Sequence, residues 1–121
     1  MAEVRVCGRD ELNDGATRVV QFGDVEFAVM RESGKYYAYR NLCPHQGGPV
    51  CEGVRTPAVE DVIGDGGIYL GKRYREDDIH IVCPWHGYSF HLADGVNVCD
   101  PKLRLQKFAV VEREGGIYVT I

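Results

Sequence analysis

Long apolar runs are missing from the sequence, and their absence bears on where the protein works. No stretch of the 121 residues is long and apolar enough to cross a bilayer. The first five residues do not lead into the apolar core of a secretory signal. We therefore expect a soluble, cytoplasmic protein with no membrane partner.

Positive charge and helical periodicity are also scarce. The 14 lysines and arginines are outnumbered by 18 acidic residues, which gives a net charge of −4 and a pI near 5.5. This balance gives no support to a nucleic-acid partner. Apolar residues show no helical period, whereas 15 glycines favour many tight turns between short strands. The composition therefore favours an all-β domain.

The usual signatures of catalysis are absent as well. Asp, Glu and His residues do not combine into an acid–base pair, and there is no hydroxyl nucleophile motif or phosphate-binding loop. Outside the metal-ligand motifs described below, we find no facial triad of two histidines and a carboxylate for a mononuclear iron. We expect no substrate site, and therefore not an enzyme.

Short alternating stretches predict about eight to ten strands in a single domain spanning residues 1–121. Residues 17–22 and 25–30 form the clearest hairpin, around Gly23-Asp24. A second hairpin is expected around residues 64–67, with residues 72–78 as an exposed charged tip. The segment 80–82 would be a strand that delivers Cys83. The remaining strands are predicted at 4–7, 36–40, 88–92, 107–112 and 117–121.

Two proline-containing motifs carry the chemistry of the sequence. They are Cys43-Pro44-His45 and Cys83-Pro84-Trp85-His86. Thiolate and imidazole suit zinc, copper and iron–sulfur centres, so the four donors predict a metal site. A structural zinc site is one alternative, although its ligands usually come as a pair of cysteines and a pair of histidines. Here each motif supplies one of each.

The two motifs and their neighbours resemble those of the Rieske family. The resemblance covers most of the chain and rests on Cys43-Pro44-His45-Gln46-Gly47-Gly48 and Cys83-Pro84-Trp85-His86-Gly87-Tyr88-Ser89-Phe90. It implies stacked small antiparallel sheets with two loops that bind one [2Fe–2S] cluster. Cys43 and Cys83 would hold the buried iron, and His45 and His86 the outer iron. Residues at about 53–80, which fit the family least well, are interpreted as an insertion between the loops.

The neighbours of the motifs also bear on the reduction potential. High-potential members of the family have a second cysteine in each loop, joined as a disulfide, and a serine and a tyrosine that hydrogen-bond the cluster. In this sequence Trp85 occupies the second-loop cysteine position, so Cys51 has no matching partner. Tyr88 and Phe90 stand where the serine and tyrosine would be. The resemblance therefore implies a low potential, near about −150 mV.

Function follows from the resemblance. A small protein of this kind would be a one-electron carrier from a flavoprotein reductase to a terminal ring-hydroxylating oxygenase, docking transiently near His45 and His86. One alternative is an electron-transfer subunit of a larger oxidoreductase such as nitrite reductase. Another is a structural zinc-binding interaction module, which would be colourless.

The remaining cysteines and histidines have simpler interpretations. Cys7, Cys51 and Cys99 are expected to be small buried apolar residues. His80 and His91 flank the second motif at strand positions, where they would at most form hydrogen bonds near a partner surface.

Overall fold

The computed structural model describes residues 2–44, 47–85 and 87–121, and it confirms an all-β architecture of antiparallel sheets. Nine strands lie in this part of the chain, together with three short 3-10 turns at Arg9–Glu11, Val50–Glu52 and Asp65–Gly67. The strands are β1 (Glu3–Gly8), β2 (Thr17–Phe22), β3 (Val25–Glu32), β4 (Lys35–Arg40), β5 (Val54–Ile63), β6 (Tyr69–Val82), β7 (Ser89–His91), β8 (Lys107–Arg113) and β9 (Gly116–Thr120).

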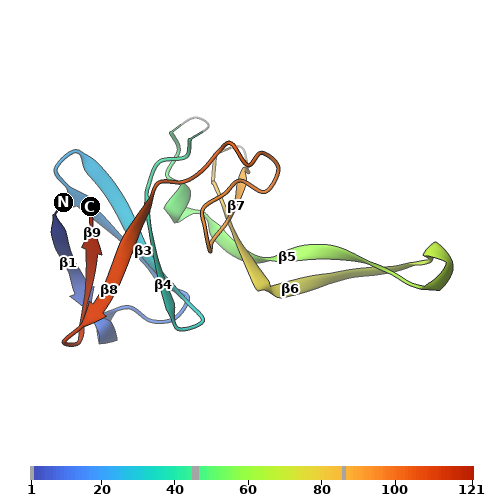
Figure 1. Ribbon diagram of the computed structural model, residues 1–121, viewed down its shortest axis with the longest axis horizontal. Helices are drawn as coiled ribbons and strands as arrows, with labels where there is room; N and C mark the ends of the chain where they lie inside the picture. The colour runs from blue at the N-terminus through green and yellow to red at the C-terminus, as the bar shows by residue number, and fades with distance from the viewer. Residues whose placement is uncertain (1, 45–46, 86) are drawn as a thin grey trace.

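A six-stranded sheet in the order β1-β9-β8-β4-β3-β2 forms the body of the molecule (Figure 1). The predicted hairpin around Gly23-Asp24 is confirmed. Strands β2 and β3 pair along their length, with Phe22 opposite Val25 beside the turn and Thr17 opposite Met30 at the far end. Strand β1 pairs with β9, so the first and last strands of the chain lie side by side.

Strand β3 separates two hydrophobic cores. Its residues Phe27 and Val29 pack in one cluster with Cys7, Ile117 and Val119 from β1 and β9. The residues that alternate with them, Ala28 and Met30, point to the other cluster, which includes both cysteines of the motifs. Because successive side chains of a strand point to opposite faces, one apolar run can serve two cores. The sheet is thus a platform for the loops that carry the motifs.

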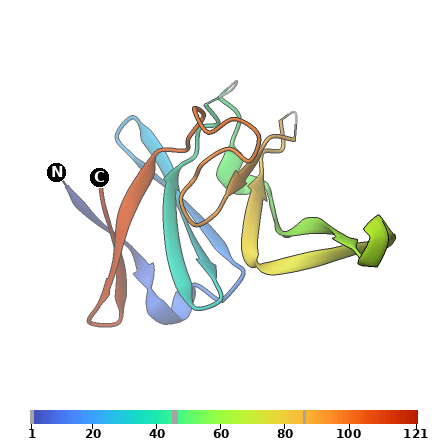
Figure 2. The same ribbon diagram turned by 45° about the vertical axis from the view of Figure 1, so that its right-hand side comes forward.

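Strands β5 and β6 form a long hairpin that projects from the body as an arm (Figures 1 and 2). With the short strand β7 they make a second, three-stranded sheet. The predicted turn at residues 64–67 is confirmed as the tip of this hairpin. Residues 72–77 are exposed, as predicted, but the prediction that residues 72–78 form the tip is wrong, since they lie within β6. Lys72 and Arg73 pair across the hairpin with Asp61 and Glu60 of β5, whereas Arg75 pairs with Asp77 of its own strand.

The arm bends away from the small sheet at an irregularity in the β5–β6 ladder. Pro57 pairs with Ile79, but the next residue, Ala58, pairs with Arg75. Residues 76–78 are therefore extra on β6, which makes a bulge. Proline has no N–H to donate to the ladder, so Pro57 is tolerated at the bulge, where the ladder is interrupted. The insertion predicted at about 53–80 coincides closely with this arm, and its status as an insertion in a single domain stays a prediction.

Within the described residues, no helix is long and apolar enough to cross a membrane.

Candidate metal centre

The first motif lies in a tight loop that follows β4. The Cys43 backbone N–H donates to the Gly48 carbonyl at 2.8 Å, and the Gly47 N–H donates back to the Cys43 carbonyl at 2.8 Å. Gly47 has a φ of +77°, a left-handed conformation that glycine adopts without steric cost. This closure fixes the direction in which Cys43 presents its thiol.

The second motif repeats the first of these two hydrogen bonds. The Cys83 N–H donates to the Tyr88 carbonyl at 2.8 Å, five residues on, as Cys43 does to Gly48. Gly87, four residues after Cys83, has a φ of +67° and matches Gly47. The predicted strand before Cys83 is confirmed as the end of β6. Two loops of the same local design thus carry the two cysteines.

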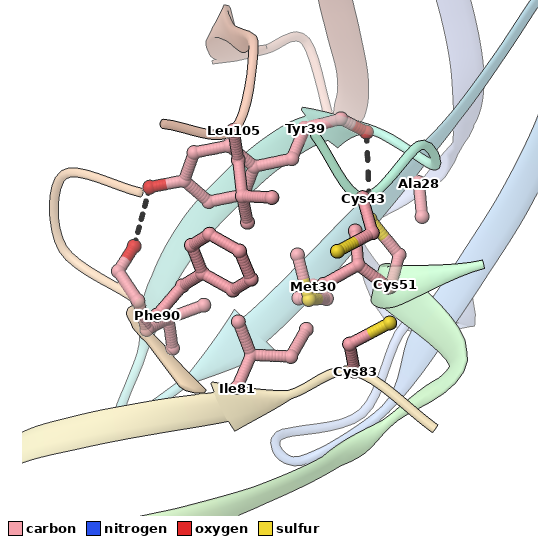
Figure 3. Packing of buried hydrophobic residues seen from close by; sticks show 11 residues of the cluster. Ala28, Met30, Tyr39, Cys43, Cys51, Ile81, Cys83, Phe90 and Leu105 are labelled. Atoms are coloured by element: carbon pink, nitrogen blue, oxygen red, sulfur yellow. Dashed lines mark hydrogen bonds between the residues drawn. The ribbon is translucent and has the colours of Figure 1, made fainter. Parts of the chain in front are cut away.

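The structure brings the two cysteines together. Both are buried and belong to the same cluster, with Cys83 pointing toward Cys43 across the space between the loops (Figure 3). Burial raises the pKa of the Cys83 thiol, and the Cys43 thiol raises it further, although a hydrogen bond from the Trp85 backbone opposes this. Two adjacent thiols in a buried site become thiolates only with a compensating cation. The donor chemistry of the site therefore suits a metal.

Trp85 connects the two loops. A side chain at Gly48 would bring its Cβ to 2.7 Å from the Trp85 ring, so only glycine leaves room for the indole. Trp85 is still 50% exposed, and Leu42 beside the first loop is also exposed. The indole therefore packs on the first loop and also contributes, with Leu42, an apolar surface next to the site.

Asn41 anchors the segment behind the first loop, a role that the sequence analysis missed. Its side-chain oxygen accepts from the Cys51 backbone N–H at 2.8 Å. Its amide nitrogen donates to Glu26 and Glu52 at 2.7 and 3.1 Å. A buried amide needs such partners, and these hold three separate segments together. Because the partners are distant in sequence, only the identity of Asn41 just before Cys43 could have hinted at the role.

Cys51 is buried, as predicted, and has no disulfide partner. All five cysteines lie in the described part of the chain and are free thiols. The Cys51 Sγ donates weakly to the Tyr39 carbonyl at 3.6 Å, and burial together with Glu52 and Glu26 raises the pKa of this thiol to about 12. Cys7 is buried too, but the prediction for Cys99 is wrong, since Cys99 is exposed where the chain turns before Pro101.

Residues 2–112 match the family model described as the Rieske [2Fe-2S] domain. The chain belongs to the Rieske [2Fe–2S] domain family. The resemblance is thereby confirmed, and with it the cofactor, one [2Fe–2S] cluster with cysteine and histidine ligands. The chemistry of the Rieske cluster agrees with two buried thiols presented from paired loops, and the zinc alternative is not supported.

Several known proteins resemble the chain over nearly its whole length. It is 29% identical to a 3-phenylpropionate/cinnamic acid dioxygenase ferredoxin subunit of Photorhabdus laumondii, covering 100% of this chain and 96% of that protein. It is 31% identical to a nitrite reductase [NAD(P)H] of Emericella nidulans, covering 93% of this chain but 10% of that protein. A complex of reduced oxygenase and oxidized ferredoxin in carbazole 1,9a-dioxygenase contains a chain with a TM-score of 0.71 and 25% identity, covering 98% of this chain and 92% of that one.

Half of the predicted Rieske ligand set can be placed. Cys43 and Cys83 come together as predicted, whereas His45 and His86 lie outside the described residues. Elsewhere the structure corrects the sequence analysis. Asp78 lies between His80 and His91, so two histidines and a carboxylate do gather away from the motifs. The only sequence signal for this group was the segment Asp78-Ile79-His80. The pairing of β6 with β7 is what brings His91 beside His80.

Proposed function

We propose that this Rieske protein is a one-electron carrier that takes electrons from a flavoprotein reductase and delivers them to a terminal ring-hydroxylating oxygenase. The observation that carries this is the pair of similarly closed loops that present Cys43 and Cys83, within a chain that resembles a dioxygenase ferredoxin subunit from end to end. When bound, a Rieske cluster accepts and releases one electron at a time. The protein's part is to hold the cluster, exclude water from its inner side and present its outer side to partners.

The proposed ligands divide between the buried and the outer side. Cys43 and Cys83 would hold the inner iron, in agreement with their burial, and His45 and His86 the outer one. Neutral imidazoles in place of two thiolates reduce the negative charge of the site, which makes an added electron easier to accept. Electron transfer would then use the end of the molecule that carries the two loops.

Docking at that end is supported by its apolar surface. Leu42 and Trp85 are exposed beside the first and second loop, respectively. A small apolar surface suits a transient complex that releases quickly, as a carrier needs. We place this exchange in the cytoplasm, because five free cysteines suit a reducing compartment.

The ligand assignment is tested by spectroscopy of the reduced protein. Wild type should give an EPR signal with an average g value below two, typical of a mixed cysteine and histidine cluster. Cys43→Ser and Cys83→Ser should lose the cluster, and His45→Cys or His86→Cys should lower the potential or lose it. Cys99→Ser is the matched control, because that thiol is exposed. An unchanged spectrum in any of the four would remove that residue from the ligand set.

A second candidate is a fixed electron-transfer subunit of a larger oxidoreductase, favoured by the match to a segment of a nitrite reductase. Purification discriminates between the two. A carrier should elute alone as a red-brown protein that is reduced and reoxidised reversibly. Stoichiometric co-purification with a large catalytic subunit from the native cells would support the subunit instead.

A further inference from the structure

Three side chains outside the proposed Rieske ligand set converge on the small sheet. Asp78 Oδ2 lies 3.2 Å from His80 Nε2, and Asp78 Oδ1 lies 2.9 Å from His91 Nδ1. The two imidazole rings meet edge to face, with their centroids 4.9 Å apart. One donor atom of each residue thus lies within 4.8 Å of the other two.

The backbone explains why these residues meet. His80 and His91 are direct partners in the β6–β7 ladder, so their side chains emerge side by side. Asp78 is the last residue of the β6 bulge, where the ladder with β5 is interrupted. Bulges re-aim side chains and often lie beside functional sites. Here the bulge places a carboxylate between two imidazoles.

The three side chains are sheltered, unlike the charges around them. The side chains of Asp78, His80 and His91 are 28%, 15% and 34% exposed, against 73% for Asp77 next in the chain. Burial works against ionisation of Asp78, but hydrogen bonds with His91 and His80 outweigh it, and the pKa of the carboxyl lies below its ordinary value. The carboxylate therefore stays charged near neutral pH, as a metal ligand must.

The donor set has the chemistry of a transition-metal site. Two imidazoles and one carboxylate bind Zn²⁺ and its first-row neighbours, with bonds of about 2.0–2.2 Å. Adjacent donors on such an ion lie about 2.9–3.5 Å apart, depending on whether the geometry is octahedral or tetrahedral. The two Asp78–imidazole separations already fall in this range. Binding would replace the protons now shared between Asp78 and the rings.

We propose that Asp78, His80 and His91 form a binding site for a divalent first-row transition cation, with water completing its coordination. Two hollows border the site. His80 lines a hollow of about 400 Å³ beside the second loop, and Asp78 lines another of about 310 Å³ near Leu92. The bound ion clamps β6 to β7, just before Cys83.

The experiment measures Zn²⁺ binding by the intact, cluster-loaded protein, so it does not depend on the proposed electron-carrier function. After treatment with a chelator, the protein is dialysed against about 10 µM Zn²⁺ at pH 7.5, and zinc and iron are counted together. Wild type should bind about one zinc per chain with its iron unchanged. His80→Gln, His91→Gln and Asp78→Asn should each weaken zinc binding about tenfold or more.

Two matched variants separate this site from other zinc ligands. Asp77→Asn removes the neighbouring exposed carboxylate and Cys99→Ser the exposed thiol, and both should bind zinc as wild type does. A wild-type protein that takes up no zinc overturns the proposal, as does zinc binding that Cys99→Ser abolishes or that the three ligand variants leave unchanged.

Discussion

At the scale of single residues, Gly53 has the least freedom to change of any glycine near the metal centre. A Cβ at this position would lie 1.7 Å from the Val82 carbonyl oxygen and 3.2 Å from the Pro84 ring, the residues on either side of Cys83. Gly53 has an ordinary φ of −77°, so the constraint is space and not backbone conformation. The glycine allows the second ligand loop to pack against the start of β5.

We expect Gly53→Ala to displace Cys83 and to lower the free energy of unfolding by about 3 kcal/mol or more, since backbone atoms must move. The iron content per chain and the visible absorption should fall sharply. Gly8→Ala is the control, because its Cβ would meet only the flexible end of Glu11. Full iron occupancy in Gly53→Ala would contradict the close packing described here.

Tyr39 offers a second test at this scale. It is fully buried, and its hydroxyl donates to the Leu92 carbonyl at 2.5 Å, joining β4 to the turn after β7 (Figure 3). Burial, followed by the charges of Asp94 and other neighbours, raises the pKa of this phenol well above its usual value of 10. The stability that Tyr39 contributes is thus complete below pH 10, the unfolded pKa, and is lost as pH rises toward the folded pKa.

We predict that Tyr39 does not ionise in the folded protein. Absorbance at 295 nm should rise equally in wild type and Tyr39→Phe up to about pH 11, and differ by one tyrosinate only after denaturation. Tyr39→Phe should also cost about 1–3 kcal/mol in urea unfolding, because the Leu92 carbonyl loses a donor. An additional tyrosinate that appears near pH 10 in native wild type would show that Tyr39 is accessible.

At the scale of elements, the β5–β6 arm is separable from the fold that holds the cluster. Beyond Ala58 its apolar side chains, including Val59, Ile63, Tyr69 and Leu70, are exposed. The charged pairs of the arm are also at the surface, where such pairs contribute little to stability. Little burial would therefore be lost if the arm were shortened.

We expect a variant in which Asn-Gly replaces residues 59–74 to fold and to bind its cluster. Ala58 and Arg75 are ladder partners, so a two-residue turn can join them. Iron content should equal that of wild type, and the unfolding temperature should change by less than about 4 °C, corresponding to less than about 1 kcal/mol. Loss of the cluster on shortening would mean that the arm supports the ligand loops.

The sequence predicted the body strands better than the arm for a physical reason. Residues 17–30 carry their own turn at Gly23-Asp24 and an alternating pattern, so their pairing is local. Residues 72–78 of β6 are mostly charged and lie outside both cores, so no apolar pattern marks them, and the path of the arm follows from the bulge and from the contacts of Arg55 on β5. That arginine donates to Thr17 at 2.6 Å and lies 3.4 Å from Glu32, partners that are distant in sequence.

The same distinction holds for the metal centre. The Cys-Pro motifs predicted that Cys43 and Cys83 lie together in two similar loops, because each motif holds its own loop closure within six residues. The Asn41 network, the packing of Trp85 on Gly48 and the cluster of Asp78 with two histidines depend on tertiary pairing. No local pattern could supply them.

At the scale of the whole molecule, the net negative charge and the surroundings of the cluster both lower the reduction potential. The protein carries a net charge of −4, which disfavours a further electron. Its five cysteines are free, so no disulfide joins the two loops, and Phe90, which the resemblance places where high-potential members have a tyrosine, is fully buried. With fewer hydrogen-bond donors to the cluster, its reduced state is stabilised less, and the reduction potential is lower.

We therefore predict a midpoint potential near the low end of the Rieske range, at about −150 mV and below zero. Protein-film voltammetry at pH 7 measures it directly. Phe90→Tyr tests the cause, because a hydroxyl that reaches the cluster should raise the potential, whereas Tyr118→Phe on the distant β9 should leave it unchanged. A wild-type midpoint above zero would contradict the prediction and would mean that backbone donors or solvent near the loops compensate for the missing hydroxyl.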